Sequence, residues 1–350
     1  MLQSLRPYLR KPRVVATFSQ VIEQLPNLKA LLEVDAVVRH PRWFHAPLLD
    51  RVVGWGKKDT GEIAREYARR HGLPYLSIED GFLRSVGLGV DGDPPCSLVV
   101  DDLGIYYDAT SESRLEAWLN APDFAPGSEE LARAARCMAA IRRERLSKYN
   151  QTPAEFELGP RDAGRPRVLV VDQTWGDMSV VLGLASQDSF EAMLRAARDE
   201  NPGAEVLVKS HPDVVRGKKR GYLHELSQRE QLRTVAEQVN PIALLEQVDK
   251  VYVATSQLGF EALMLDKQVT CFGAPFYSGW GLTDDRTRVV RRARRRSLAE
   301  LFCAAYLRYA RYVDPETGER CELEATIAYL AARRQRAAGA AAIAEAGRPR

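Results

Sequence analysis

Short runs of aliphatic residues alternate along this chain with amphipathic segments of helical spacing, and this alternation constrains the fold more than any other feature. In the first half the runs occupy residues 14–18, 36–38, 52–55 and 75–78, with helices expected near 61–71 and 128–149. In the second half they occupy residues 168–171, 205–208, 251–254 and 269–272, with helices expected near 189–199, 241–247 and 258–265. The sequence therefore predicts the α/β class, with mostly parallel sheets covered by helices.

A stretch rich in proline and glycine, residues 152–167, separates the two halves and marks a domain boundary. The 350 residues have room for two lobes that face a central cleft, each with its own core. Two more helices, near 297–312 and 323–338, are expected to pack back across the lobes. The predicted division is a first lobe over 1–152, a linker over 153–166, a second lobe over 167–296, C-terminal helices over 297–337 and a disordered tail over 338–350.

The charge balance argues against one class of partner. The 50 Lys and Arg residues stand against 47 Asp and Glu, and a formal net charge of +3 gives no case for nucleic-acid binding. Seven arginines do gather between residues 286 and 296. There a solvated connection is favoured over a patch for anionic lipid or an acidic glycan.

The cysteines and the N-terminal residues bear on location. Five scattered cysteines form no CxxC pair and no cluster of zinc spacing, which predicts a reducing compartment and no metal site. The first 18 residues hold charges and no long apolar run, so neither a signal peptide nor a transmembrane helix is expected there. The sequence thus predicts a cytoplasmic protein that touches a membrane only peripherally.

Two pairs of carboxylates stand where strands are expected to end. Adjacent side chains on a strand point opposite ways, so at most one of Glu79 and Asp80 can face the cleft unless the following glycine turns the chain. The pair could serve as general acid or base, or form a charged turn with Arg84. Asp172 follows four apolar residues and Asp177 lies five positions later, and both a helix cap and a catalytic role are open for them.

Two further polar clusters have the chemistry of phosphate binding. Lys209 and His211 lie where a predicted strand runs into a loop fixed by Pro212. This arrangement favours phosphate binding over the alternative, a basic loop that is merely solvated. Ser256 lies at the start of a helix, where a hydroxyl and free N–H groups can hold a phosphate. Glu261, about one turn into that helix, could accept hydrogen bonds from a ribose, although a plain helix cap with a solvated glutamate is the alternative.

Taken together, these stretches closely resemble the KpsC-type capsule polysaccharide β-Kdo transferases, which build the poly-Kdo linker of lipid-anchored capsules. The resemblance runs from residue 54 to residue 315 and rests on EDGFLRSVGLG (79–89), PPCSLVVDDLGIYYDAT (94–110), DQTWGDMS (172–179), KSHPDV (209–214), SQLGFEAL (256–263) and GAPFYSGWGLTDDR (273–286). The acidic-acidic-Gly and His-Pro elements are also similar to those of bacterial sialyltransferases.

The resemblance implies a GT-B-like architecture of two Rossmann-type lobes and a retaining transfer of Kdo from CMP-β-Kdo, with neither cofactor nor catalytic metal. It also implies a Kdo-terminated or phosphatidylglycerol-linked acceptor, and a place at the cytoplasmic face of the inner membrane near capsule assembly proteins. Such proteins usually carry two modules in tandem, whereas this chain has no internal repeat of the motifs. It therefore corresponds to one module that makes one type of linkage.

The resemblance also implies roles for individual residues. Asp172 is expected to be the nucleophile of a glycosyl-enzyme intermediate, with Asp177 in reserve, and Glu79 and Asp80 are expected to transfer protons. The residues expected to bind the donor are Lys209, His211, Pro212, Ser256, Gln257, Glu261 and Gln173, with Arg84 or Lys57 for the carboxylate of the sugar.

Three alternatives stay open at this point. A GT-B enzyme could use CMP-sialic acid or a UDP-sugar, since one fold supports many donors. A non-hydrolysing sugar-nucleotide epimerase also has two Rossmann lobes. A non-catalytic subunit that binds glycan or lipid is the third, and the intact carboxylates and His-Pro loop argue against it.

Overall fold

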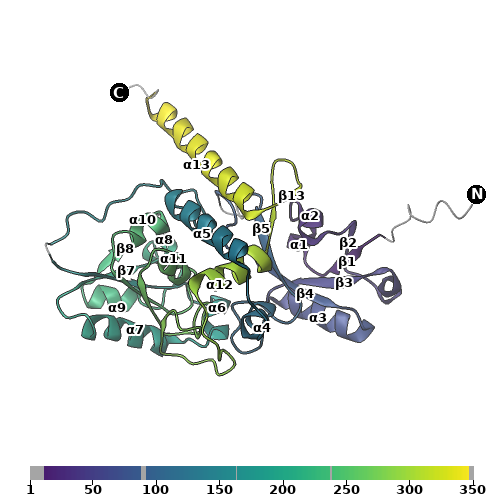
Figure 1. Cartoon of the computed structure of the whole chain (residues 1–350), viewed down its shortest axis with the longest axis horizontal. Coiled ribbons are helices and arrows are strands. Elements are labelled where there is room, and N and C mark those ends of the chain that lie inside the picture. The colour runs from purple at the N-terminus through teal and green to yellow at the C-terminus, as the bar shows by residue number, and fades with distance from the viewer. Residues whose placement is uncertain (1–11, 88–91, 163, 237–238, 347–350) are drawn as a thin grey trace, which may run out of the picture.

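A computed structural model describes residues 12–87, 92–162, 164–236 and 239–346, and in it the chain forms two sheets covered by helices (Figure 1). The first sheet has the strand order β13-β12-β5-β4-β3-β1-β2. Four of its strands are parallel neighbours: β1 (Val14–Thr17), β2 (Ala36–Arg39), β3 (Arg51–Trp55) and β4 (Tyr75–Asp80). The other three extend it by antiparallel pairing: β5 (Ser97–Asp101), β12 (Ala310–Val313) and β13 (Arg320–Cys321).

The second sheet is parallel throughout, in the order β11-β10-β9-β6-β7-β8. Its strands are β6 (Arg167–Val171), β7 (Glu205–Lys209), β8 (Arg233–Val235), β9 (Lys250–Val253), β10 (Gln268–Cys271) and β11 (Asp284–Asp285). Read from β8, this is the 3-2-1-4-5-6 order of dinucleotide-binding sheets. The order reverses between β6 and β9, and ligands bind at the carboxyl ends of the strands at such a point.

Helix α7 (Gln187–Asp199) illustrates how local sequence specifies these elements. The side chain of Ser186 accepts a hydrogen bond from the N–H of Ser189 and so caps the helix start. Its buried side chains recur at helical spacing and turn one face toward the sheet: Phe190, Met193, Leu194 and Ala197.

The remaining helices lie between and around the strands. In the first lobe they are α1 (Gln20–Glu23), α2 (Leu28–Leu32), the 3₁₀ helix η2 (Trp43–Leu48), α3 (Asp59–His71), α4 (Arg114–Asn120) and α5 (Ser128–Arg143). In the second lobe they are α6 (Met178–Leu182), α8 (Pro212–Val215), α9 (His224–Arg229), α10 (Pro241–Leu245) and α11 (Leu258–Met264). The C-terminal part holds α12 (Leu298–Phe302), the π-helical η4 (Cys303–Tyr309) and α13 (Leu323–Ala346), which lies beside α5 and extends beyond it (Figure 1). No helix within the described ranges is both long enough and apolar enough to cross a bilayer.

The predicted GT-B-like arrangement of two Rossmann-type lobes is confirmed, with corrections at element level. The helix expected over 297–312 ends at Tyr309, and residues 310–313 form strand β12, because pairing with the edge of β5 overrides the helical pattern. Strands β5, β8, β11 and β13 were not predicted. Helix α5 ends before the expected 149, and α13 continues to Ala346 through much of the expected tail, whose last residues, 347–350, lie outside the described part.

One hydrophobic core joins both lobes. It contains residues from the first sheet, the second sheet and η4. At its centre Tyr306 of η4 stacks on Phe82 of the first lobe, with ring centroids 4.9 Å apart, and on Phe260 of the second, 5.5 Å apart. Burial of such rings contributes strongly to stability, so η4 fastens the lobes together.

The arginine-rich segment is a second connection between the lobes. Arg292 is 7% exposed, and its Nε donates to Oε2 of Glu116 on α4 at 3.1 Å, while Arg291 Nε donates to Oε1 at 2.7 Å. The Arg296 guanidinium donates to the carbonyls of Leu119, Ala121 and Phe124. The expectation of a solvated connection is therefore wrong for Arg292, whose charge is buried and paired.

Candidate active site

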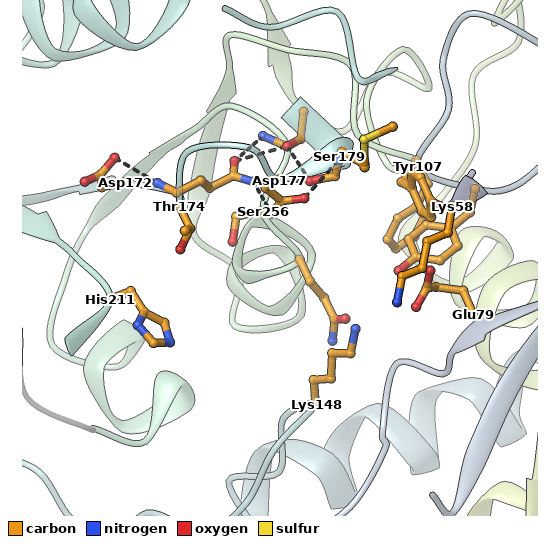
Figure 2. Close-up of a pocket in the computed structure, with 16 residues that line it drawn as sticks. Lys58, Glu79, Tyr107, Lys148, Asp172, Thr174, Asp177, Ser179, His211 and Ser256 are labelled. Atoms are coloured by element: carbon orange, nitrogen blue, oxygen red, sulfur yellow. Dashed lines mark hydrogen bonds between the residues drawn. The ribbon is translucent and has the colours of Figure 1, made fainter. Parts of the chain in front are cut away.

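A cavity of about 500 Å³ lies between the lobes, at the carboxyl ends of β4, β6 and β9 (Figure 2). Side chains from both lobes line it, so it occupies the expected central cleft. The first lobe and the segment after α5 contribute Lys58, Glu79, Tyr106, Tyr107 and Lys148. The second lobe contributes Asp172, Gln173, Thr174, Asp177, Met178, Ser179, His211, Thr255, Ser256, Gln257 and Phe276.

The adjacent carboxylates at the end of β4 have different surroundings. Glu79 lines the cavity, and its Oε1 accepts a hydrogen bond from Trp55 Nε1 at 2.9 Å. Asp80 points the other way, where its Oδ1 accepts from Arg84 Nε at 2.8 Å and its Oδ2 from the hydroxyl of Tyr149 at 3.3 Å. The prediction that only one of the two faces the cleft is confirmed. Burial raises the pKa of Glu79, and the neighbouring Asp80 charge raises it further, against the effect of Lys148.

Asp172 follows β6 and is 7% exposed. Its Oδ2 accepts from the Ser210 hydroxyl at 3.2 Å, and its Oδ1 accepts from three backbone N–H groups, those of Gln173, Tyr222 and Leu223, at 2.9 to 3.0 Å. Burial raises the pKa of Asp172, and the hydrogen bonds act in the opposite direction. Both carboxylate oxygens thus serve to tie the end of β6 to the loop before α9.

Gln173 connects the carboxyl ends of β6 and β9. Its Oε1 accepts from the backbone N–H of Thr255 at 3.0 Å and from the Thr255 hydroxyl at 3.1 Å. Its Nε2 donates to Ser179 Oγ at 3.3 Å and to Asp177 Oδ2 at 3.4 Å. Asp177 also caps α6, because its Oδ1 accepts from the N–H of Ser179 at 2.9 Å. Gln173 and Ser179 therefore orient the Asp177 carboxylate toward the cavity (Figure 2).

His211 is the residue of the basic loop that lines the cavity. Its Nδ1 accepts a hydrogen bond from the backbone N–H of Asp213 at 3.1 Å, which leaves Nε2 available to a ligand. Burial lowers the pKa of His211, so near neutral pH the ring is mainly uncharged and donates through Nε2. Lys209 is not among the lining residues, and its ammonium donates to the carbonyl of Ser210. Pro212 is the first residue of α8.

Ser256 and Gln257 line the cavity, whereas Glu261 does not. Glu261 is 3% exposed, and its Oε1 accepts from the Ser147 hydroxyl at 2.7 Å and from Gln257 Nε2 at 3.2 Å. Gln257 Nε2 also donates to the carbonyl of Phe82 at 3.0 Å. This network joins α11 to the first lobe, so the geometry does not support the expected ribose contact of Glu261.

Both cations expected to meet the sugar carboxylate lie outside the cavity lining. Arg84 is buried against Asp80, and Lys57 forms an ion pair with Asp108 at 2.8 Å. The lysines that do line the cavity, Lys58 and Lys148, were missed. Lys58 lies in the short turn between β3 and α3, and this place near a strand end is a signal that could have indicated it.

The aromatic residues Tyr106 and Tyr107 were missed as well. They lie in the loop after β5, a strand that was not predicted, so no strand end pointed to them. Within the described ranges, no three His, Cys, Asp or Glu side chains are arranged to hold a metal ion.

A family model described as "Capsule polysaccharide biosynthesis protein" matches residues 50–313. This chain belongs to that family. Residues 50–313 include the end of β4, both loops that carry Asp177 and His211, and strand β12, so the match covers the whole cavity.

Relatives of this capsule polysaccharide family cover most of the chain. It is 47% identical over 341 residues, 94% of its length, to the capsule polysaccharide modification protein LipA of Neisseria meningitidis serogroup B. It is 43% identical over 281 residues, 80% of the chain and 63% of the relative, to the lipopolysaccharide-processing protein LpsZ of Rhizobium meliloti. The chain spans about half the length of LipA, 48%.

Two solved structures from Thermosulfurimonas dismutans have the same fold. The KpsC β-Kdo 2,4 transferase superposes with a TM-score of 0.85 and 47% identity, covering 93% of this chain and 99% of that one. The KpsC β-Kdo 2,7 transferase superposes with a TM-score of 0.67 and 30% identity, covering 91% and 98%.

Proposed function

We propose that this chain is a Kdo glycosyltransferase of capsule polysaccharide biosynthesis that uses CMP-β-Kdo as donor and retains the anomeric configuration. The observation that carries the proposal is the 47% identity, over 93% of the chain, to the KpsC β-Kdo 2,4 transferase. Because identity to the 2,7 transferase is only 30%, a β-2,4 linkage is the product we expect.

The second lobe has the features of a nucleotide-binding half. Its sheet has the dinucleotide-binding order, and His211, Thr255 and Ser256 gather at the carboxyl ends of β7 and β9. A neutral His211 donating through Nε2, together with the two hydroxyls, suits the leaving phosphate of CMP. These three side chains can donate hydrogen bonds to the phosphate without a divalent cation.

The contacts favour Asp177 over Asp172 as the nucleophile. Within the described ranges, the oxygens of Asp172 accept four hydrogen bonds, whereas those of Asp177 accept two, from the N–H of Ser179 at 2.9 Å and from Gln173 at 3.4 Å. Figure 2 shows the Asp177 carboxylate near the middle of the cavity and that of Asp172 at its edge. A carboxylate saturated with donors is a weak nucleophile, so we assign Asp172 a positioning role.

The reaction then has two steps. An oxygen of Asp177 forms a bond to the anomeric carbon of Kdo while the bond from that carbon to the phosphate oxygen breaks, and CMP departs with the electron pair. In the second step Glu79 accepts the proton of the acceptor hydroxyl, whose oxygen attacks the same carbon and releases Asp177. Two inversions give net retention.

The test is to incubate the protein with freshly generated CMP-β-Kdo and a Kdo-terminated acceptor. Asp177→Asn is expected to bind CMP normally and to lose transfer by about a thousandfold or more, since it keeps the shape and removes the attacking charge. Without acceptor, the wild type is expected to gain the mass of one Kdo residue on the peptide that contains Asp177. An adduct on Asp172, or a product of inverted configuration, contradicts the assignment.

A lipid-linked acceptor would bring the protein to a membrane. The exposed side chains of η2 support a peripheral contact of this kind, because Trp43 is 76% exposed and Leu48 is 64% exposed beside the exposed Arg42. We infer that η2 meets the cytoplasmic face of the inner membrane.

A further inference from the structure

Lys148 extends into the cavity from the segment that follows α5. Figure 2 shows its side chain directed toward the middle of the cavity, between Glu79 on one side and His211 on the other. Its ammonium makes no hydrogen bond or ion pair with any residue in the described ranges. By contrast, Arg84 is paired with Asp80 and Lys57 with Asp108, so those two charges are already neutralised.

The backbone around Lys148 is firmly held between the lobes. Its carbonyl accepts hydrogen bonds from the N–H groups of Arg84 at 3.0 Å and Ser85 at 3.3 Å. On one side of it, the Ser147 hydroxyl donates to Glu261 at 2.7 Å, and on the other the buried Asn150 donates to the carbonyl of Ser85 at 3.0 Å. A side chain on such a support is pre-organised for binding.

The charge of Lys148 persists at any physiological pH. Burial lowers its pKa, but electrostatic interactions with Tyr106, Asp80, Tyr149 and Glu79 raise the pKa by a larger amount. The nearby carboxylates are committed elsewhere: Asp80 to Arg84, and Glu79 Oε1 to Trp55. Within the described ranges, neither lysine of the lining, Lys148 or Lys58, forms an ion pair, and their ammonium groups lie 5.9 Å from the Tyr149 ring centroid and 5.4 Å from the Trp55 ring centroid. Of the two, Lys148 is the one whose side chain extends toward the middle of the cavity (Figure 2).

We propose that Lys148 binds the carboxylate of the transferred sugar, so that the cavity selects 2-keto acid sugars over neutral hexoses. This inference rests on the proposed function. The phosphate is better served by His211, Thr255 and Ser256 on the second lobe, whereas Lys148 lies on the first-lobe side near Glu79. The sugar must lie between the leaving phosphate and the base that activates the acceptor, and in a 2-keto acid sugar the carboxylate is attached to the anomeric carbon itself.

The experiment compares three ligands: a hydrolysis-resistant phosphonate analogue of CMP-β-Kdo, the same compound with its carboxylate replaced by a carboxamide, and CMP. Affinities are measured by calorimetry. The wild type is expected to prefer the carboxylate by about ten- to a hundredfold, the effect of one charge-assisted hydrogen bond. Lys148→Met is expected to lose this preference and keep the wild-type affinity for CMP, and Lys148→Arg to keep part of the preference.

Lys58→Met is the matched variant, because it removes the other lysine of the lining without an ion pair, and it is expected to keep the preference. A Lys58→Met protein that loses the preference while Lys148→Met keeps it assigns the carboxylate to Lys58 and overturns the inference. A Lys148→Met protein that still prefers the carboxylate overturns the inference, as does one that loses CMP affinity by the same factor, which would assign Lys148 to the phosphate. If Lys148→Met does not fold, Lys148→Gln replaces it in the same comparison. A wild type that binds UDP but neither analogue nor CMP overturns the proposed function, and the inference with it.

Discussion

Glu79 and Asp80 are chemically alike and adjacent, yet only Glu79 faces the cavity, because successive side chains on β4 point to opposite sides. Glu79→Gln is expected to leave stability nearly unchanged and to reduce transfer by about a hundredfold or more, since Gln cannot accept the acceptor proton. Wild-type transfer is expected to rise with pH as Glu79 ionises, above the usual pH for a glutamate because its pKa is raised. Initial rates across pH, measured for both proteins, check this.

Asp80→Asn is the matched change on the other side of the strand. The side chains of Asp80 and Arg84 are 14% and 7% exposed, so removing the carboxylate charge leaves a buried guanidinium without its counter-ion. Breaking a buried pair in this way costs about 3 to 5 kcal/mol. Urea unfolding is expected to show that loss for Asp80→Asn only, and a stable Asp80→Asn protein without transfer activity would instead place Asp80 in the chemistry.

Glu261 makes stability depend on pH. Burial raises its pKa from 4.5 to about 7, so the folded protein binds a proton that the unfolded chain releases. The stability that this proton contributes is present at low pH and is lost as pH rises from 4.5 through about 7, a change of about 3 kcal/mol.

Glu261→Gln stays neutral and removes this dependence. The free energy of unfolding of the variant minus that of the wild type is expected to be up to about 3 kcal/mol larger at pH 8 than at pH 4.5. Urea unfolding at both pH values measures the difference, and Glu319→Gln, a change on the surface, serves as control. If the free energy of unfolding of the variant minus that of the wild type is the same at both pH values, Glu261 does not change its protonation state on folding in this range.

At the scale of elements, η2 concentrates exposed apolar surface in one short helix. Replacing Trp43 and Phe44 together by serine is expected to reduce binding to vesicles of anionic phospholipid by about tenfold or more, because each ring buries apolar area in the bilayer interface. Co-sedimentation measures the bound fraction. Val290→Ser is the control, since Val290 is 77% exposed on the second lobe. An equal loss in the control, or a wild type that does not bind, contradicts a membrane role for η2.

The strands and the helices between them could be predicted from the sequence where an apolar run ended in polar residues, as at β4, β6 and β7. The same rule identified Glu79, Asp172, Asp177 and His211, because carboxyl ends of parallel strands meet at one edge. Strands β5 and β12 were not predicted. They pair with each other across about 200 residues of chain, and their short apolar patterns are equally compatible with other secondary structure.

The misassigned residues have a related cause. Lys148 lies after a helix, and it reaches the cavity because the two lobes pack together. A local sequence pattern carries no information about this packing. The reverse holds for Glu261 and Arg84, whose charges suggested ligand contacts. Glu261 is buried against Ser147, which is far away in the chain and which no local pattern could indicate. Arg84 is paired with Asp80, four residues before it, which is the alternative that the sequence had left open.

At the scale of the whole molecule, the shared core and the arginine segment make the two lobes one mechanical unit. Glu116→Gln leaves Arg292 buried without its counter-ion and is expected to cost about 3 kcal/mol or more in a single unfolding transition. Glu130→Gln is the matched control, because its partner Arg308 lies at the surface, where such a pair contributes about 0 to 1 kcal/mol. Urea unfolding of both variants checks the contrast. Two separate transitions in the wild type would mean that the lobes unfold independently.

Strand β12 also sets the order in which the nascent chain can complete its structure on the ribosome. The first sheet needs residues 310–313 to cover the edge of β5, and these are synthesised only after every strand of the second lobe. Until then β5 exposes unpaired N–H and C=O groups, which other chains can join. The half of the protein that is translated first is therefore the half that finishes folding last, and its exposed edge is the point at which slow translation or crowding would favour aggregation.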